Sequence, residues 1–349
     1  MILLFAALLP LLQVPPPASS AHKGLTHMAP TPMSVRASAT PRMWVRASVI
    51  PRMWVRASAL TSSYIPERVY DTRARAFTDF EVMLADAARA DVLFIGEQHD
   101  DANTHALELA VLEGLTRRNV PLILSLEMFE RDVQDTLDRY LAGTIAEEEF
   151  LKSSRPWPRY ATDYRPLVEF ARAQRMHVVA ANVPRRLAAD VSRGGLAALE
   201  ALASDRALAA RDLQCPTEGE YYTRFVAQMS GHPMPGDEQA TPEQTRARND
   251  RFYLAQCVKD ETMAESIATA FAAPSGAPRT IVHVTGAFHS DFAEGTAARA
   301  RRRLPDRRIV VISVLPVPSG QIDTVRPTDA DMKRADFLIY SVAPPASER

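Results

Sequence analysis

Polar side chains that could catalyse a reaction or bind a metal follow four apolar runs of strand length. Glu97 and His99 follow the first run, Glu127 ends the second, Asn182 ends the third, and His289 follows the fourth. Two imidazoles and a carboxylate can hold a divalent metal such as zinc, manganese or cobalt, with one position left open for water. The same side chains can act without a metal as general acid and base, because a carboxylate can orient one imidazole. Spacing alone leaves both chemistries open.

Both histidines belong to a Gly-x-x-His (GxxH) motif, at 96–99 and at 286–289. Glycine permits a tight turn after a strand, and the third residue beyond it can then point back over the edge of the sheet. Catalysis of either kind would use Glu97, His99, Glu127 and His289. A metal-dependent form would hold its ion with Glu97, His99 and His289, and we expect Asp100, His105 and Asn182 to line the same crevice.

The segments between these residues predict the elements that position them. Runs of strand length alternate with longer segments of helical period, which is the pattern of βαβ units around a mostly parallel sheet. The expected strands are residues 91–95, 122–126, 177–181, 280–284, 309–312 and 337–340. Ligands of open α/β sheets bind outside the carboxyl ends of the strands. The polar side chains after the first four runs are therefore expected to converge on one crevice.

A long connection before the fourth run predicts a cap over this crevice. It extends from about residue 194 to about residue 245, and a helix from about 246 to 271 follows it. Such a connection exceeds what a simple crossover needs. It carries Tyr221, Tyr222 and His232.

Composition excludes several classes of protein. Of the 349 residues, 46% are apolar, which is enough for a sizeable core. The 41 basic and 42 acidic residues create no net field that would attract nucleic acid. Two cysteines are too few for a cysteine-rich zinc module or an iron–sulfur protein. No apolar run is long enough for a transmembrane segment.

The first 63 residues are expected to lie outside the folded domain. Residues 1–21 resemble a signal peptide, and residues 22–63 form a disordered leader with three copies of a ten-residue repeat. We therefore expect an exported protein, periplasmic or secreted. No cysteine follows the apolar run, so a lipoprotein is not expected. In an oxidising compartment Cys215 and Cys257 could pair, whereas inside the cell they would be ordinary small apolar residues.

Five motifs resemble those of the ChaN-type haem-binding uptake proteins, which share a superfamily with Tiki, TraB and erythromycin esterases. They are IGEQHD at 95–100, LEMF at 126–129, VAANVP at 179–184, AQCVKDETMA at 255–264 and GAFH at 286–289. The resemblance extends over roughly residues 64–315. It implies a ChaN-like α/β domain at 64–349, with a three-layer, mostly parallel sheet flanked by helices and a helical cap insertion at about 194–245.

For the ligand, the resemblance implies haem held by a homodimer, with a tyrosine of one subunit on each iron and a histidine of the other near a propionate. A phenolate can serve as an axial haem ligand. Tyr222 is the favoured ligand, because Phe225 and Met229 would share its helix face at three- and seven-residue spacing. Tyr221 is the alternative ligand, and His232 is the candidate propionate contact.

Three functions are compatible with these observations. The leading expectation is a non-enzymatic haem-binding protein for haem or iron uptake or handling. The Tiki branch of the superfamily instead implies a metal-dependent hydrolase, and the erythromycin-esterase branch implies hydrolysis by His and Glu without an obligatory metal. The third is an interaction protein that keeps the crevice only as a structural relic. Fold alone does not decide among them.

Overall fold

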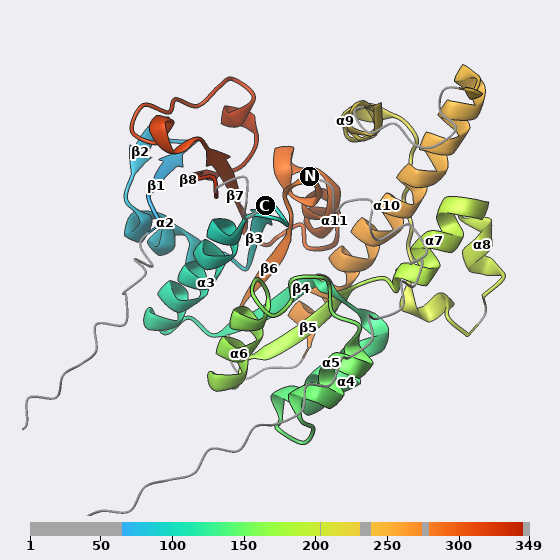
Figure 1. The fold of residues 1–349 in the computed structure, drawn as a ribbon, viewed down its shortest axis with the longest axis horizontal. Helices are drawn as coiled ribbons and strands as arrows, with labels where there is room; N and C mark the ends of the chain where they lie inside the picture. Colours follow the sequence, from blue (N-terminus) through green and yellow to red (C-terminus); the bar gives the residue numbers. More distant parts are fainter. Residues whose placement is uncertain (1–64, 203, 231–238, 274–278, 345–349) are drawn as a thin grey trace, which may run out of the picture. The chain divides into compact units, whose positions relative to one another are not determined.

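Eight strands form one sheet in the part of the chain that the computed structural model describes, residues 65–202, 204–230, 239–273 and 279–344 (Figure 1). Their order is β2-β1-β8-β7-β3-β6-β4-β5. Neighbours pair in parallel except β2 with β1 and β1 with β8. The strands are β1 (Glu67–Asp71), β2 (Ala76–Thr78), β3 (Val92–Glu97), β4 (Leu122–Glu130), β5 (His177–Asn182), β6 (Thr280–Gly286), β7 (Ile309–Val317) and β8 (Phe337–Val342).

The six strands expected from the apolar runs are all present, as β3 to β8. The central strands β3 and β6 are buried over their whole length, because helices cover both faces of a parallel sheet. β1 and β2 were not predicted. They are short, and most of their residues are at least partly exposed, so they lack a continuous apolar run.

The helices alternate with the strands as the sequence predicts. α3 (Ala102–Arg117) connects β3 with β4, and α11 (Gly295–Arg303) connects β6 with β7. The Asp101 side chain accepts hydrogen bonds from two free backbone N–H groups at the start of α3. The other helices are α2 (Phe80–Ala87), α4 (Gln134–Leu141), α5 (Glu147–Ser154), α6 (Arg165–Ala173), α7 (Arg185–Gly194), α8 (Ala197–Glu200), α9 (Gly219–Ser230) and α10 (Pro242–Ala272).

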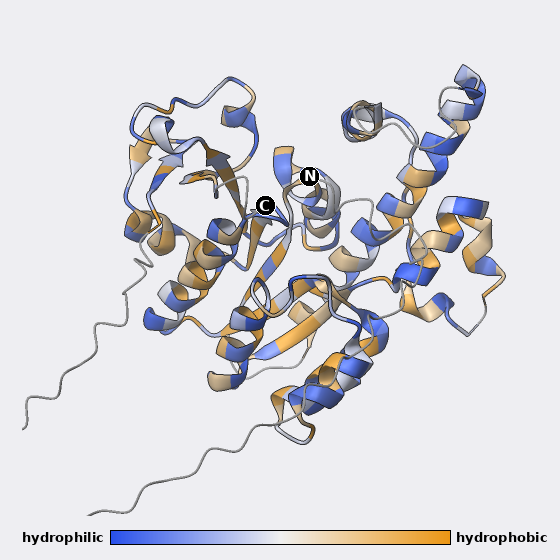
Figure 2. Cartoon of the chain, viewed as in Figure 1, coloured by the Kyte–Doolittle hydropathy of each residue, from blue (hydrophilic) through white to orange (hydrophobic). Residues whose placement is uncertain are grey.

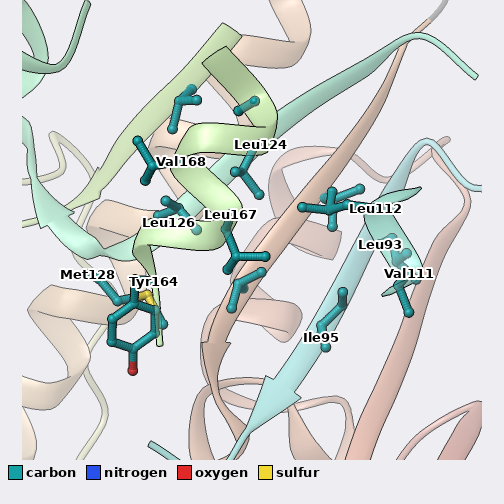
Figure 3. Packing of buried hydrophobic residues seen from close by; sticks show 14 of the residues in the cluster. Leu93, Ile95, Val111, Leu112, Leu124, Leu126, Met128, Tyr164, Leu167 and Val168 are labelled. Carbon is teal, nitrogen blue, oxygen red and sulfur yellow. The ribbon is translucent and has the colours of Figure 1, made fainter. Parts of the chain in front are cut away.

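Side chains of the strands alternate between two faces, and helices cover each face. Leu93 and Ile95 of β3 pack in a cluster with residues of α2, α3 and α6, part of which Figure 3 shows. Val92 and Phe94 of the same strand pack in a second cluster with residues of α10 and α11. Figure 2 shows mainly hydrophobic central strands, whereas the helices carry residues of both kinds. The predicted three-layer α/β architecture is confirmed.

The predicted helical insertion contains α8 and α9, and the long helix α10 follows it. α10 begins at Pro242, somewhat before the expected start near residue 246. Thr241 and Gln244 form a capping box there, which satisfies free backbone groups at the helix start. A disulfide joins Cys215, just before α9, to Cys257 in α10. The pairing that an oxidising compartment would permit is therefore present, and it ties the cap to α10.

The expected signal peptide at 1–21, the leader at 22–63 and His232 lie outside the described residues. Within the described part of the chain, no helix is both long and apolar enough to cross a membrane.

Candidate functional site at the carboxyl ends of the central strands

The carboxyl ends of three neighbouring strands form the floor of the site. Glu97 ends β3, Gly286 ends β6, and Glu127 lies in the last part of β4. β6 lies between β3 and β4, so the two carboxylates flank the end of β6. A pocket opens there, lined by Glu97, His99, Asp100, Gly286, Phe288 and His289, and by Arg224 and Gln228 of α9. The cap helix α9 therefore borders the crevice.

His289 lies between two carboxylates from different elements. Its Nδ1 is 2.6 Å from Oδ1 of Asp260 in α10, and its Nε2 is 3.4 Å from Oε1 of Glu127. The side-chain amide of Gln256 lies against the same ring, 3.1 Å from Nε2. Burial would lower the pKa of His289, but the two carboxylates outweigh burial and raise it to about 10. His289 is therefore a cation at neutral pH.

Hydrogen bonds from both neighbouring strands fix Glu127. Its Oε2 accepts from the Thr285 hydroxyl at 2.6 Å and from the backbone N–H of Gly286 at 2.8 Å. The Asn182 side chain, at the end of β5, donates to the Glu127 backbone carbonyl at 3.1 Å. Although burial raises the pKa of Glu127, the charge of His289 holds it well below its usual value. Asn182 thus supports the end of β4 from the side instead of lining the pocket.

His99 forms the other half of the site together with Glu97. Its Nδ1 is hydrogen-bonded to Oε1 of Glu97, and the Tyr164 hydroxyl donates to the same oxygen at 2.8 Å. Burial opposes the charged imidazole, but Glu97 and then Glu127 raise the pKa of His99. Each pocket histidine therefore has a carboxylate partner that favours its protonated form.

The glycines of the GxxH motifs allow close packing rather than unusual backbone turns. A turn follows each strand end, at His99 after β3 and at Ala287–His289 after Gly286, but neither Gly96 nor Gly286 has a positive φ. A β-carbon on Gly96 would lie 2.7 Å from Oγ of Ser290, and one on Gly286 would lie 2.8 Å from Nε2 of His99. Gly96 thus makes room for Ser290, which follows the second motif, and Gly286 makes room for His99 of the first motif.

His105 lies beneath the crevice and does not line it. It is buried in α3, where its Nδ1 is 3.2 Å from Oε2 of Glu108 and 3.6 Å from Oε2 of Glu97. Its Nε2 is 3.5 Å from Oδ2 of Asp163. Of the residues expected to line the crevice, Asp100 does so, whereas His105 and Asn182 act from behind it.

The expected metal ligands Glu97, His99 and His289 do not form a compact ligand set. Among the described residues, one group places three donor atoms within 4.8 Å of one another, and it consists of Glu97, His105 and Glu108. His289 instead directs its nitrogens to Asp260 and Glu127. The structure therefore gives no support to a metal held by the two GxxH histidines.

Tyr221 occupies the buried face of α9. It packs there with Phe225 and Met229, which lie four and eight residues further along the helix. Its hydroxyl donates to Oδ2 of Asp260 at 2.7 Å. Burial and the Asp260 charge raise the pKa of Tyr221 well above its usual value. The helix face expected for Tyr222 therefore belongs to Tyr221.

Tyr222 lies on an adjoining, half-buried side of α9. Its hydroxyl donates to Oδ1 of Asp250 at 2.5 Å, and its ring meets that of Tyr253 edge to face. Burial and the hydrogen bond to Asp250 raise the pKa of Tyr222. A second pocket adjoins this side of the helix, lined by Tyr222, Val226, Ser230, Ala240, Pro242, Thr245, Arg246 and Asn249.

Sequence reasoning missed three residues of the site, Asp260, Gln256 and Tyr164. Gln256 and Asp260 are one helical turn apart in the long helix, inside the AQCVKDETMA motif. Polar residues at that spacing in a buried helix segment are a usable signal of a polar site. Tyr164 offers no such signal, because only the fold brings it to Glu97.

The pocket carries charges of both signs. Arg224 and Arg334 line it together with Glu97, Asp100 and Asp291. Arg334 is paired with Asp291 and Arg224 with Glu294, just as His289 is paired with Asp260 and Glu127. The two guanidinium groups approach the Phe292 ring, with distances of 4.3 Å and 5.0 Å to its centroid. A protonated imidazole can donate a hydrogen bond or a proton, which fits carboxylate binding or general acid chemistry.

Comparisons with known proteins identify the family and agree with the fold. The sequence matches the family model of haem-binding uptake proteins of the Tiki superfamily, ChaN, over residues 83–300. The structure is similar to that of ChaN of Campylobacter jejuni, described with cofacial haem binding, at a TM-score of 0.56 and 17% identity, covering 79% of this chain and 96% of that chain. No curated protein matches the sequence.

Two further structures are less similar. An erythromycin esterase mutant in its open conformation has a TM-score of 0.46 and 12% identity, covering 80% of this chain and 99% of that chain. A type III effector has a TM-score of 0.42 and 14% identity, covering 75% and 92%. Because the family model spans more than half of the chain, the protein belongs to the ChaN family of haem-binding uptake proteins within the Tiki superfamily.

Proposed function

We propose that this protein binds haem through Tyr222 and serves haem or iron uptake or handling outside the cytoplasm. The observation that carries the proposal is the position of Tyr222, in a chain of the ChaN family, beside a pocket between α9 and the start of α10. Val226 and Pro242 of that pocket offer apolar surface to a porphyrin. Arg246 supplies a cation for a propionate.

The two tyrosines differ in how well they fit a haem iron. Tyr221 is buried and its hydroxyl is bound to Asp260, so iron binding would require the core under the cap to open. Tyr222 is half-buried and adjoins the pocket. Burial and the hydrogen bond to Asp250 raise its pKa, but at this half-buried position the phenol can reach an iron without opening of the core. These contacts favour Tyr222.

Export is the second part of the proposal. The Cys215–Cys257 disulfide supports it, because structural disulfides persist in oxidising compartments and are rare in the cytosol. The signal peptide expected at 1–21 would direct the chain there. A homodimer around haem, with His232 near a propionate, completes the proposal by analogy with the family.

Hemin titration tests haem ligation. We expect a saturable Soret band with the full chain, strongly weakened in Tyr222→Phe and retained in Tyr221→Phe and His99→Ala. Sedimentation with and without hemin would detect a haem-dependent dimer. A Soret band that is unchanged in Tyr222→Phe would overturn ligation by this residue, and a flat titration of the wild type would overturn haem binding.

A hydrolase is the second candidate, and the pairing of pocket histidines with carboxylates favours it. His289 is held by Asp260 and Glu127, and His99 by Glu97, around a pocket open to solvent. Such pairs can supply general acid and base groups. Turnover of ester substrates that is lost in both His99→Ala and His289→Ala, but not in Tyr222→Phe, would establish this activity. Equal turnover in all variants would exclude it.

A further inference from the structure

Three potential metal ligands lie together beneath the floor of the pocket. Glu97 at the end of β3 and His105 and Glu108 on α3 are 2%, 4% and 0% exposed, so bulk water does not surround them. Their donor atoms lie within 4.8 Å of one another. His105 and Glu108 are three residues apart on α3, which places both side chains on the face that packs toward β3.

The distances within this group fit the ligand shell of a metal ion. Nδ1 of His105 is 3.2 Å from Oε2 of Glu108 and 3.6 Å from Oε2 of Glu97. Ligands at roughly 2.0–2.2 Å from a tetrahedral ion are separated by roughly 3.3–3.6 Å. The three atoms could therefore bind one ion with only small side-chain movements.

The other nitrogen of His105 is held as in many metal sites. Its Nε2 is 3.5 Å from Oδ2 of Asp163 and 3.3 Å from the backbone carbonyl of His99. Histidine ligands commonly donate their second N–H to a carboxylate or a carbonyl, which fixes the ring orientation. Arg159 in turn donates to Asp163 at 2.7 Å, so the orienting carboxylate is itself anchored.

Two oxygens of the group are buried without a hydrogen-bond partner. They are Oε2 of Glu97 and Oε1 of Glu108. Buried polar atoms are nearly always paired, and an unpaired buried carboxylate oxygen is costly. Oε1 of Glu97 is already used by His99 and Tyr164, so Oε2 is the oxygen left for a further ligand.

We propose that Glu97, His105 and Glu108 bind one divalent transition-metal ion beneath the pocket floor. One imidazole and two carboxylates form a donor set that suits Mn²⁺, Fe²⁺ or Zn²⁺ better than a soft ion. The ion would neutralise the two buried carboxylates. Because Glu97 contacts the group through Oε2 and His99 through Oε1, the ion would also fix the carboxylate that orients His99.

The proposed metal site is distinct from the proposed haem site and from a metal site built on the two GxxH histidines. It shares Glu97 with the pocket, but His289 takes no part in it and Tyr222 lines a different pocket. The competing arrangement has no metal. Burial and the charge of Glu97 raise the pKa of Glu108 well above its usual value, so a proton on Glu108 would then balance the group.

Metal analysis of the full chain, followed by Mn²⁺ and Zn²⁺ titration after chelator treatment, separates these arrangements. We expect one ion per chain. Loss of a direct ligand in Glu108→Gln or His105→Gln should weaken the affinity by more than the roughly 10–100-fold that loss of an outer-shell partner costs. His289→Ala should bind the ion as the wild type does. The Mn²⁺-loaded protein should show electron-nuclear coupling to one imidazole nitrogen, and this coupling should be absent in His105→Gln.

Glu108→Gln also controls for folding, because a glutamine imitates the protonated Glu108 of the metal-free arrangement. If the wild type binds no ion with saturation, the proposal is overturned. It is also overturned if Glu108→Gln, folded with an unchanged melting temperature, binds the ion as tightly as the wild type. Loss of the ion in His289→Ala with retention in His105→Gln would move the site to the GxxH histidines.

Discussion

Gly286 and His99 belong to different GxxH motifs, and they touch at the floor of the pocket. A β-carbon on Gly286 would lie 2.8 Å from Nε2 and 2.9 Å from Cε1 of His99, closer than any side chain allows. The glycine of the second motif therefore sets the position of the histidine of the first. The two motifs therefore form one structural unit, although 190 positions separate Gly96 from Gly286 in the chain.

Replacing Gly286 with alanine should displace His99 from Glu97. The added methyl group has no space while the imidazole stays in place, and overpacking of this kind costs about 1–3 kcal/mol. Urea unfolding should therefore show a lower midpoint for Gly286→Ala. Gly320→Ala is the matched control, because nothing lies within 4 Å of a β-carbon there. Equal midpoints in the two variants would show that His99 moves without cost.

His289 should stay protonated throughout the neutral pH range. Its pKa of about 10 in the folded protein exceeds the value near 6.5 of an unfolded chain. The ion pairs therefore stabilise the fold fully below about pH 6.5, and this contribution is lost as the pH rises through about 10. NMR titration of the imidazole should show no transition between pH 6 and 8, and Asp260→Asn should lower its pKa.

His283 provides an internal control in the same titration. It is buried in β6, with Nδ1 2.9 Å from the Ser125 hydroxyl oxygen, and burial lowers its pKa to about 3. Its signal should therefore be that of a neutral ring across the range in which His289 is charged. A transition of His289 near pH 6.5 would contradict the pairing with Asp260 and Glu127.

Local sequence patterns predict the centre of this fold better than its edges. Buried runs such as 92–97 and 280–286 are mainly apolar because both faces of the sheet are covered, and this leaves a clear signal. β2 is only three residues long and is stabilised by pairing with β1, which no local pattern reveals. Long-range pairing also explains why Asp260 was missed. Its role depends on His289, which the fold brings to α10 from a different strand end.

In the cap, the sequence alone could not assign which tyrosine lies on the buried face of the helix. Tyr221 and Tyr222 are adjacent, so the sequence assigns the buried face only through the spacing of their neighbours. Phe225 and Met229 match Tyr221 by whole helical turns, and the structure buries these three together. The spacing used for Tyr222 is also allowed in a helix, and only packing against α10 decides between them.

Removing the disulfide should destabilise the cap and α10. Cys215 and Cys257 are 42 positions apart, and closing a loop of that size stabilises a protein by about 2–4 kcal/mol. The Cys215→Ser, Cys257→Ser double variant should therefore unfold at lower urea concentration than the wild type under oxidising conditions. With a reducing agent present, the two midpoints should coincide. A difference that persists after complete reduction would assign the loss to packing of the serines instead.

The two tyrosines of α9 should contribute to different properties, Tyr221 to stability and Tyr222 to haem binding. Tyr221→Phe removes the hydroxyl that donates to the buried Asp260, and the loss of such a bond costs about 1–3 kcal/mol. Tyr222→Phe removes a half-buried hydroxyl bound to Asp250, which costs less because solvent can replace it. Thermal unfolding without hemin should therefore rank Tyr221→Phe below Tyr222→Phe, whereas hemin affinity should rank them in the opposite order. If Tyr221→Phe lost both stability and haem while Tyr222→Phe lost neither, the buried tyrosine would be the iron ligand and the cap would have to open to bind haem.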